Sequence, residues 1–544
     1  MHGLMQDRSL DVPVLMRRAE RMFAHKRVVT ATAGGETTAT WGEVVARARR
    51  LTAALDVLDV PRDARVGTFA WNTQRHVELY LGVPSGRRVL HTLNHRLFAA
   101  ELTYILNDAG DDVLFVDRSL IATVWPLVEK APAVRHVVLM DDGGTEETPD
   151  DPRIVDYEAL LAETPGEARP IAIDENDAAS LCYTSGTTGR PKGVLYSHRS
   201  IVLHTLMILG TDNFGIGERD VVMPIVPMFH VNAWGLPYAA ALAGADLVLP
   251  GPAMNSAALA RQMSGHRVTF TAGVPAIWRS LLPLMEQVDV SSLRKVVSGG
   301  SPVPDALARE WHEATGVPLS SSWGMTETSP VVASARLATV HDELGSDAQR
   351  AILAAPGPSL PLTELRLVDE DGDRVDHDGA TPGELQVAGP TVASRYFGSD
   401  PGESQFTEDG WLRTGDVATI DRYGYVRIVD RTKDMVKSGG EWISSGALEN
   451  EIMAHPDVVE AAVIGVPDAR WGERPLACVV LAPERHLDEA GLREHLTGRV
   501  ASWWIPERLW ILPEIPKTGT GKFSKTTLRQ QFAAHQQEQH ADDQ

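Results

Sequence analysis

Residues 184–193 read Thr-Ser-Gly-Thr-Thr-Gly-Arg-Pro-Lys-Gly, a polar stretch between the strand-like runs 178–183 and 194–196. Glycines allow backbone N–H groups to approach an anion closely, and the hydroxyls and the Lys192 cation add further donors. No Walker A frame can be read in this stretch. The pattern favours a strand–loop–strand unit that binds a polyphosphate, against the alternative of a surface loop with turn-forming residues.

Length and composition limit the possible classes of protein. A chain of 544 residues is too long for one ordinary core, so two or more domains are expected. Hydrophobic content of 43% and charged content of 23% are typical of a soluble globular protein. The 51 basic and 73 acidic residues give a net charge of −22, which argues against a nucleic-acid-binding surface. A small anionic substrate is not excluded, because a few cations close to a binding site outweigh the average field of the net negative charge.

The cysteines and the apolar segments bear on location. Only Cys182 and Cys478 occur, far apart, so neither a metal site nor a disulfide framework can be built from them. This usage fits a reducing cytoplasm. Residues 1–14 lack a continuous apolar region, so no signal peptide is expected. Residues 236–249, the most apolar stretch, are too short and too interrupted to span a bilayer.

Strand-like and helix-like segments alternate through most of the chain. Helices are predicted over 12–24 and 41–58, the second with Thr40 as cap and Glu43 at its third position. The alternation in the middle of the chain predicts a mostly parallel sheet with helices on its faces, an α/β fold. The predicted elements are strands over 65–71, 113–116, 178–183, 221–226, 245–249, 268–272, 293–298 and 317–322, and helices over 201–209 and 305–313.

Three candidate motifs follow strands in this pattern: residues 184–193, residues 298–302 (Ser-Gly-Gly-Ser-Pro) and residues 323–328 (Trp-Gly-Met-Thr-Glu-Thr). Ligands of open α/β sheets bind at the carboxyl ends of the strands. Their common placement is therefore an independent reason to group the three motifs into one site.

From about residue 361 the sequence predicts shorter strands separated by turns. The charged run 430–434 is interpreted as a domain boundary, followed by a small α+β domain. The tail from Gln536 is predicted to be disordered. In the small domain, helices are predicted over 446–454, 488–498 and 524–534, and strands over 459–465, 475–481 and 508–512.

Four motifs stand in the order used by the adenylate-forming enzymes. The chain resembles that superfamily, which includes acyl-CoA synthetases, peptide-synthetase adenylation domains and luciferases, over essentially its whole length. Residues 226–234 and 437–445 are most similar to bacterial medium- and long-chain fatty acyl-CoA synthetases and to methylmercaptopropionate-CoA ligases. The four motifs are Tyr-Thr-Ser-Gly-Thr-Thr-Gly (183–189), Trp-Gly-Met-Thr-Glu-Thr (323–328), Arg-Thr-Gly-Asp (413–416) and Pro-Lys-Thr-Gly-Thr-Gly-Lys (516–522).

The resemblance implies an AMP-forming acid–thiol ligase with ATP, Mg²⁺ and coenzyme A. A carboxylate attacks the α-phosphate of ATP to give acyl-AMP and pyrophosphate, and the thiol of CoA then displaces AMP. It also implies a large adenylation domain over 1–432, with parallel-rich sheets and a β-rich subdomain. A small mobile α+β domain over 433–544 carries the catalytic lysine.

The resemblance also implies roles for individual residues. Glu327, with Thr184, is the implied magnesium ligand, in keeping with the preference of a hard cation for oxygen donors. The residues implied to bind the β- and γ-phosphates are Thr184, Ser185, Gly186, Thr187, Thr188, Gly189 and Lys192, and Thr326 is implied to bind the α-phosphate. Gly299, Gly300 and Trp323 are implied to bound the adenine, Asp416 to bind the ribose, Arg431 to reach the ribose or a phosphate, and Lys437 and Gly439 to reach the pantetheine channel. Ser301, Gly324, Met325 and Trp442 are further implied cofactor-binding residues in the same motifs.

The implied catalytic residues are Lys522, Thr184, Glu327 and His230. Lys522 would stabilise the reacting carboxylate and α-phosphate electrostatically, without acting as a base. Rotation of the small domain about Lys433 would then withdraw Lys522 and bring Lys437 into place.

The acyl end of the cleft is implied to involve His230, Trp234 and Gly299. His230 is interpreted as bordering the acyl and thiol end, against the alternative of a packed core residue. Trp234 resembles a gate on the acyl tunnel, with an ordinary core aromatic as the equal alternative.

Alternatives remain for the substrate, the acceptor and the assembly. The alternative substrates are an aryl acid and an oxyanion such as nitrite, and the alternative acceptor is a carrier protein. A non-catalytic nucleotide-binding protein is disfavoured because Glu327, Asp416 and Lys522 are all present. The resemblance implies a homodimer formed through the N-terminal part, and acyl length cannot be read from the sequence.

Overall fold

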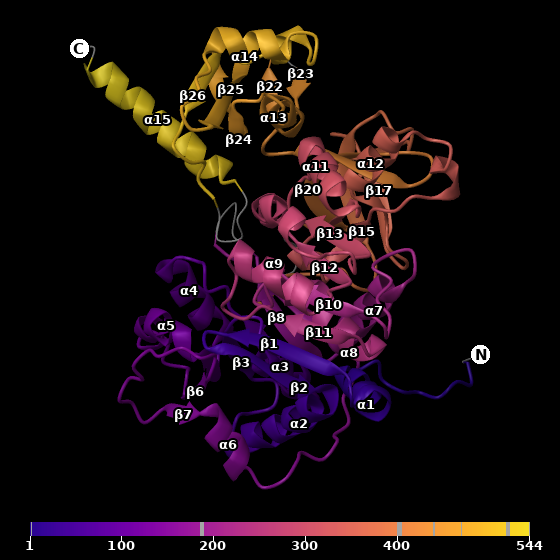
Figure 1. The fold of residues 1–544 in the computed structure, drawn as a ribbon, viewed down its shortest axis with the longest axis vertical. Coiled ribbons are helices and arrows are strands. Elements are labelled where there is room, and N and C mark those ends of the chain that lie inside the picture. Colours follow the sequence, from indigo (N-terminus) through magenta and orange to yellow (C-terminus); the bar gives the residue numbers. More distant parts are fainter. Residues whose placement is uncertain are drawn as a thin grey trace. The chain divides into compact units, whose positions relative to one another are not determined.

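The computed structural model describes residues 1, 3–184, 190–399, 405–438, 441–468, 470–517 and 523–542. No helix within these ranges has both the length and the apolar character needed to cross a bilayer. The chain forms two compact units (Figure 1). The first unit comprises Met1–Val303, Leu307–Glu364 and Ala388–Leu412, and the second comprises Pro304–Ala306, Leu365–Val387 and Arg413–Gln544.

The first unit contains two sheets whose interior strands are parallel. One has the order β15-β14-β13-β12-β10-β11-β1-β2, antiparallel only at its two edge pairs. The other has the order β7-β6-β5-β3-β4-β8-β9, antiparallel only between β8 and β9. The strands of these two sheets are β1 (Arg27–Thr32), β2 (Gly35–Thr40), β3 (Arg65–Phe69), β4 (Val89–Thr92), β5 (Val113–Asp117), β6 (His136–Met140), β7 (Ile154–Asp156), β8 (Ala178–Tyr183), β9 (Gly193–Ser197), β10 (Val221–Pro224), β11 (Asp246–Leu249), β12 (Phe270–Gly273), β13 (Lys295–Gly299), β14 (Leu319–Gly324) and β15 (Val331–Ser334). The short strand β16 (Gly357–Pro358) belongs to neither sheet.

The α/β class is confirmed, but the expectation of a single sheet through the middle of the chain is wrong. β8 lies in a different sheet from β10 to β14, beside β4. The reason is that an apolar run reveals a strand but not its partner, and strand pairing depends on contacts between distant segments. Residues 184–193, here called the phosphate-loop candidate, therefore follow a strand of one sheet. The motifs at 298–302 and 323–328 follow strands of the other sheet.

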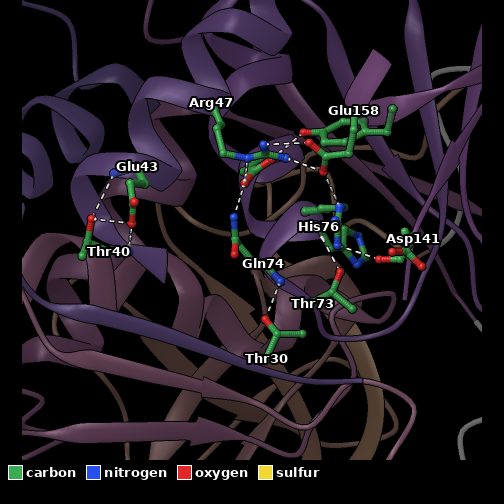
Figure 2. Close-up of polar contacts among 12 residues, drawn as sticks. Thr30, Thr40, Glu43, Arg47, Thr73, Gln74, His76, Asp141 and Glu158 are labelled. Carbon is green, nitrogen blue, oxygen red and sulfur yellow. Dashed lines mark hydrogen bonds and ion pairs between the residues drawn. The ribbon is translucent and has the colours of Figure 1, made fainter. Parts of the chain in front are cut away.

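Several helices of the first unit begin at a residue whose side chain caps them. Thr40 and Glu43 form the predicted capping box of α2, as Figure 2 shows. Thr73 caps α3, and Asp11 caps α1. The helices are α1 (Val12–Phe23), α2 (Trp41–Val57), α3 (Gln74–Ser85), α4 (Ala99–Ala109), α5 (Ile121–Val128), α6 (Tyr157–Glu163), α7 (His198–Leu209), α8 (Leu236–Ala243), α9 (Ser256–Gly265), α10 (Pro275–Leu281), α11 (Asp305–Thr315) and α12 (Ser346–Ala354), with short 3-10 turns η1 (Arg118–Leu120), η2 (Val231–Gly235), η3 (Leu282–Gln287), η4 (Thr326–Thr328) and η5 (Thr339–His341).

The second unit combines short strands with a small α+β portion. Its first strands pair in the order β21-β20-β19-β17-β18, and its later strands in the order β23-β22-β25-β24, with β26 parallel to β25. The elements are β17 (Glu364–Val368), β18 (Arg374–Val375), β19 (Gly383–Ala388), β20 (Leu412–Ile420), β21 (Tyr425–Arg431), β22 (Val436–Ser438), β23 (Glu441–Ile443), β24 (Val458–Asp468), β25 (Gly472–Leu481), β26 (Arg508–Ile511), α13 (Ser445–Met453), α14 (Glu489–Leu496), η6 (Ser502–Trp504) and α15 (Lys525–Asp542).

Two local predictions need correction. The strand predicted over 221–226 ends at Pro224, and the next two N–H groups both donate to the carbonyl oxygen of Ala272. The tail from Gln536 was predicted to be disordered, but α15 continues to Asp542. Its glutamine, glutamate and alanine residues are good helix formers, and this propensity outweighs the polar composition.

Candidate active site

Backbone hydrogen bonds close the base of the phosphate-loop candidate. β8 and β9 pair with Tyr183 opposite Gly193. The Thr184 N–H donates to the carbonyl oxygen of Lys192 over 2.9 Å, and the Lys192 N–H donates to Thr184 Oγ1 over 3.1 Å. Residues 185–189, which carry most of the predicted phosphate contacts, lie outside the described residues. The described ends show a loop whose two sides are held together.

A tight turn at the end of β14 carries the second group of predicted residues. The pairing of β14 with β15 is irregular between Trp323 and Gly324. A Cβ atom on Gly324 would lie 1.9 Å from the carbonyl oxygen of Pro330, so only glycine fits at this position. The turn places Thr326 and Glu327 in η4, where they are 8% and 6% exposed. Glu327 is thus a largely buried carboxylate at the end of a strand.

Hydrogen bonds from distant segments bring these two motifs together across the two sheets. The Tyr196 hydroxyl, on β9, donates to the carbonyl oxygen of Thr326 over 2.6 Å. The Ala393 N–H donates to the carbonyl oxygen of Glu327 over 2.7 Å, and the Phe397 N–H donates to that of Gly193 over 2.8 Å. Residues 323–328, here called the adenylate motif, and the residues that follow the phosphate-loop candidate therefore share one region of the first unit.

Tyr396 also belongs to this region, although sequence reasoning missed it. Its hydroxyl donates to Glu327 Oε1 over 2.6 Å, and Lys192 Nζ lies 4.5 Å from the centre of its ring. Tyr396 stands 69 residues after Glu327 in the chain. A single tyrosine in a Ser-Arg-Tyr-Phe stretch carries no spacing or pattern that would have revealed either contact.

Two of the predicted substrate residues lie against each other. Gly299, at the end of β13, pairs with Ser322 on β14. A Cβ atom on Gly299 would lie 2.8 Å from the indole Cη2 of Trp234 and 2.8 Å from the carbonyl oxygen of Ser322. The indole therefore occupies the space that a side chain at position 299 would need. Of the neighbouring predicted residues, Gly300 has a φ of +82° and Ser301 is exposed.

Trp234 lies in an unusual left-handed turn that follows the half-buried His230. Val231, Asn232, Ala233 and Trp234 have φ values of 42°, 52°, 48° and 56°. Left-handed conformation costs roughly 1–2 kcal/mol per L-residue. The turn is buried, and Asn232 Oδ1 accepts a hydrogen bond from the Ser180 hydroxyl over 3.2 Å. Packing and this bond hold the backbone in a conformation that the residues alone would not choose.

The residues of the first unit fit a magnesium ion that is bound together with phosphates. The described residues contain no cluster of three or more His, Cys, Asp or Glu side chains able to hold a metal by themselves. Magnesium is usually held by one or two carboxylates together with the phosphates of a substrate. Glu327 offers a carboxylate oxygen and Thr184 a hydroxyl, both of the hard donor type that the ion prefers.

In the second unit, the β20–β21 hairpin places Asp416 opposite Arg431. Arg431 Nε lies 3.4 Å from Asp416 Oδ1, and Asp416 is 5% exposed. Lys433 follows in a turn, where partial desolvation of its ammonium group and the nearby Arg431 lower its pKa. Lys437 Nζ lies 4.9 Å from the ring centre of Trp442, its cross-strand neighbour. The predicted residues Gly439 and Lys522 lie outside the described part of the chain.

An α/β fold in which a glycine-rich stretch, closed at its base, shares a region with a buried carboxylate is the arrangement expected of a nucleotide-binding enzyme. Residues 16–397 match the model of the AMP-binding enzyme family, and residues 447–522 match that of the AMP-binding enzyme C-terminal domain. The chain belongs to the AMP-binding enzyme family. It is an AMP-forming acid–thiol ligase that adenylates an acid and transfers the acyl group to CoA, with ATP, Mg²⁺ and CoA as cosubstrates and cofactor.

Relatives with known activities cover nearly the whole chain. A long-chain-fatty-acid–CoA ligase of Thermus thermophilus is 44% identical over 97% of this chain and 96% of its own length. A 3-methylmercaptopropionyl-CoA ligase of Ruegeria lacuscaerulensis is 41% identical over 98% of this chain and 99% of its own. The solved structure of the anthranilate CoA ligase AuaEII with anthranoyl-AMP has a TM-score of 0.84 and 28% identity, covering 98% of this chain and 100% of that one.

Proposed function

We propose that this ligase activates a fatty acid of medium or long chain length. The observation that carries the proposal is the packing of the Trp234 indole against Gly299. It places an aromatic, apolar side chain against a glycine that the resemblance assigns to the acyl end of the site. The identity of 44% to a long-chain-fatty-acid–CoA ligase supports the same substrate class.

In the first half-reaction, a carboxylate must approach a polyanion, so positive charge must offset the repulsion. We assign the magnesium ion, which supplies part of that charge, to Glu327 and Thr184. The loop 184–193 holds the β- and γ-phosphates, and Thr326 holds the α-phosphate. Gly299, Gly300, Ser301 and residues 323–325 bound the adenine, with the Trp323 ring stacked on it.

The second unit contributes residues whose roles depend on the half-reaction. We assign the ribose hydroxyls to Asp416 and Arg431, and the charge on the reacting oxygens to Lys522. Rotation about Lys433, at the boundary between domains 1–432 and 433–544, exchanges Lys522 for Lys437, Gly439 and Trp442 at the pantetheine channel. His230 borders the acyl and thiol end of the cleft.

A contact within the second unit supports Lys433 as the hinge. Arg529, on α15, donates to the carbonyl oxygen of Lys433 over 3.3 Å and to Asp434 Oδ1 over 3.2 Å. The helix that begins three residues after Lys522 is therefore bonded to the hinge segment. A change of backbone angle at Lys433 would be transmitted to that helix.

Pyrophosphate exchange tests the substrate assignment. The enzyme should exchange labelled pyrophosphate into ATP only when Mg²⁺ and a cognate acid are supplied, with the highest kcat/KM for a fatty acid of six or more carbons. A panel of acids of increasing length, with 3-methylmercaptopropionate, benzoate, anthranilate and nitrite, measures this. The highest kcat/KM on an aryl acid or nitrite would refute the fatty-acid assignment, and ADP in place of AMP would refute the reaction itself.

A short thioether acid is the second candidate substrate. The observation in its favour is the identity of 41% to a 3-methylmercaptopropionyl-CoA ligase, nearly that of the fatty-acid ligase. An apolar pocket gains only about 1–3 kcal/mol per methylene, so one cleft accepts neighbouring lengths with graded efficiency. In the same panel, a maximum at 3-methylmercaptopropionate with a decline toward longer acids would favour this candidate.

We further propose that the enzyme is a cytoplasmic homodimer assembled through the N-terminal part of the first unit. The resemblance to bacterial fatty acyl-CoA synthetases supports the dimer. Two free, buried cysteines support the reducing compartment. Sedimentation at micromolar concentration should give a species of about twice the chain mass of 59.1 kDa, and a monomer under these conditions would refute the dimer.

A further inference from the structure

The segment from Thr391 to Phe397, here called the clamp, connects the phosphate loop with the adenylate motif. At one end the Ser329 hydroxyl donates to the carbonyl oxygen of Thr391 over 2.8 Å. In the middle, the Ala393 N–H bonds the carbonyl oxygen of Glu327, and at the other end the Phe397 N–H bonds that of Gly193. The clamp thus contacts both halves of the nucleotide site through its backbone.

The Tyr396 hydroxyl fixes one oxygen of the Glu327 carboxylate. Its hydrogen bond to Oε1 spans 2.6 Å, and the two side chains belong to residues that are 3% and 6% exposed. A carboxylate that accepts a bond at one oxygen has its plane held in one orientation. Hydrogen bonds of this kind orient metal-binding carboxylates. Their loss typically lowers metal affinity or activity by roughly 10–100-fold.

The Tyr396 ring contacts the other charged group of the site. Lys192 Nζ lies 4.5 Å from the ring centre, within the range of a cation–π interaction. The same ammonium group lies 3.4 Å from Gln405 Oε1. Phe406 packs edge-on against the ring at 5.7 Å between centres, which holds the ring in place. One buried side chain therefore contacts both the predicted metal ligand and the predicted phosphate ligand.

We infer that Tyr396 is a positioning residue of the first half-reaction, orienting Glu327 for the magnesium ion through its hydroxyl and Lys192 for the phosphates through its ring. The inference rests on the proposed roles of Glu327 and Lys192. It goes beyond those roles, because Glu327 and Lys192 could bind their ligands without any contribution from Tyr396. Tyr396 itself touches neither the reacting atoms nor, by this inference, the metal.

The test replaces Tyr396 with Phe, which removes the hydroxyl but leaves the ring against Lys192 and Phe406. Tyr157→Phe is a matched control within the same unit. The Tyr157 hydroxyl donates to Glu78 Oε2, also over 2.6 Å, and both residues are fully buried. The control therefore measures what the loss of a buried phenol–carboxylate bond does to folding alone.

The Mg²⁺ concentration for half-maximal pyrophosphate exchange should rise about tenfold in Tyr396→Phe, the lower end of the range for such bonds. Excess Mg²⁺ should restore most of the rate, and KM for the acid should not change. Binding of Mn²⁺ in the presence of a non-hydrolysable ATP analogue, followed by electron paramagnetic resonance, should weaken by a similar factor. Tyr157→Phe should match the wild type in both readouts, whatever its loss of thermal stability.

A shift in Mg²⁺ and Mn²⁺ dependence no larger than that of Tyr157→Phe would overturn the inference. Tyr396→Leu tests whether the ring orients Lys192. The KM for ATP of Tyr396→Leu should exceed that of Tyr396→Phe, and equal values would overturn the part of the inference that concerns Lys192. The proposed function is tested separately by Glu327→Gln. If Glu327→Gln keeps the Mg²⁺ dependence of the wild type, the assignment of the metal to Glu327 is wrong. If the Mg²⁺ dependence changes in Glu327→Gln but not in Tyr396→Phe, only the inference about Tyr396 is contradicted.

Discussion

The two units of this chain present their predicted site residues in different ways. In the first, Thr184, Gly299 and Glu327 stand at or just beyond the ends of strands in parallel-rich sheets. Side chains from distant segments hold them, as Tyr396 holds Glu327. In the second, Lys433 and Lys437 stand in an exposed turn and on a three-residue strand, β22.

This difference matches what each group must do. Donors that stabilise charge are effective when they are already oriented before the reaction, because no free energy is then lost in reorganising them. Residues that act in only one half-reaction must instead arrive and leave. The first unit holds its predicted site residues through contacts from distant segments, and the turn at Lys433 is where the proposed rotation of the second unit would occur.

The largest expected effect comes from removing the predicted mobile cation. Lys522→Ala should lower the rate of acyl-AMP formation from the carboxylic acid and ATP by a factor of about 10²–10³, because one preorganised group that stabilises transition-state charge is lost. Transfer of the acyl group from supplied acyl-AMP to CoA should survive, since Lys522 is predicted to act only in the first half-reaction. Quenched-flow measurement of acyl-AMP, and separately of acyl-CoA, distinguishes the two steps.

Lys433→Pro is the converse variant in this comparison. Proline fixes φ near −65° and should oppose the rotation without touching a ligand of the first half-reaction. Adenylate should form and accumulate, while thioester formation falls at least about tenfold, the effect of only about 1.4 kcal/mol of added barrier. If both variants lose both steps to the same extent, the assignment of the half-reactions to two positions of the second unit is wrong.

A smaller effect concerns the stability of the first unit in acid. Burial lowers the pKa of His204 to about 3 and that of His76 and His198 to about 4, from 6.5. The unfolded chain therefore binds more protons below pH 6.5, so the free energy of unfolding should fall as the pH drops from 6.5 toward 4. A fully buried histidine such as His76 accounts for about 2 kcal/mol between pH 7 and pH 5.

Urea unfolding at pH 7 and pH 5, followed by tryptophan fluorescence, measures this loss. His204→Gln provides the control, because the glutamine amide oxygen can replace His204 Nε2 as acceptor for the Val331 N–H. The variant should lose less stability than the wild type over the same pH interval. An identical loss in both proteins would show that His204 is not a source of the acid sensitivity.

The sequence alone determined much of the fold and the candidate residues of the site. The strand over 178–183, the capping box at Thr40 and Glu43, and the positions of β13 and β14 follow from local hydrophobic period and capping chemistry, which neighbouring residues encode. The motifs around Thr184, Glu327 and Asp416 indicated the nucleotide chemistry for the same reason, since each is a contiguous pattern. The roles of the individual residues remain predictions.

Only the tertiary structure decided how these motifs meet. That β8 lies in a different sheet from β14, that Tyr196 nevertheless bonds Thr326, and that Tyr396 bonds Glu327 all depend on pairings between segments far apart in the chain. The left-handed turn that places Trp234 against Gly299 is likewise held by its surroundings against the preference of its own residues. Such contacts form only after distant segments have packed together, so no local pattern announces them.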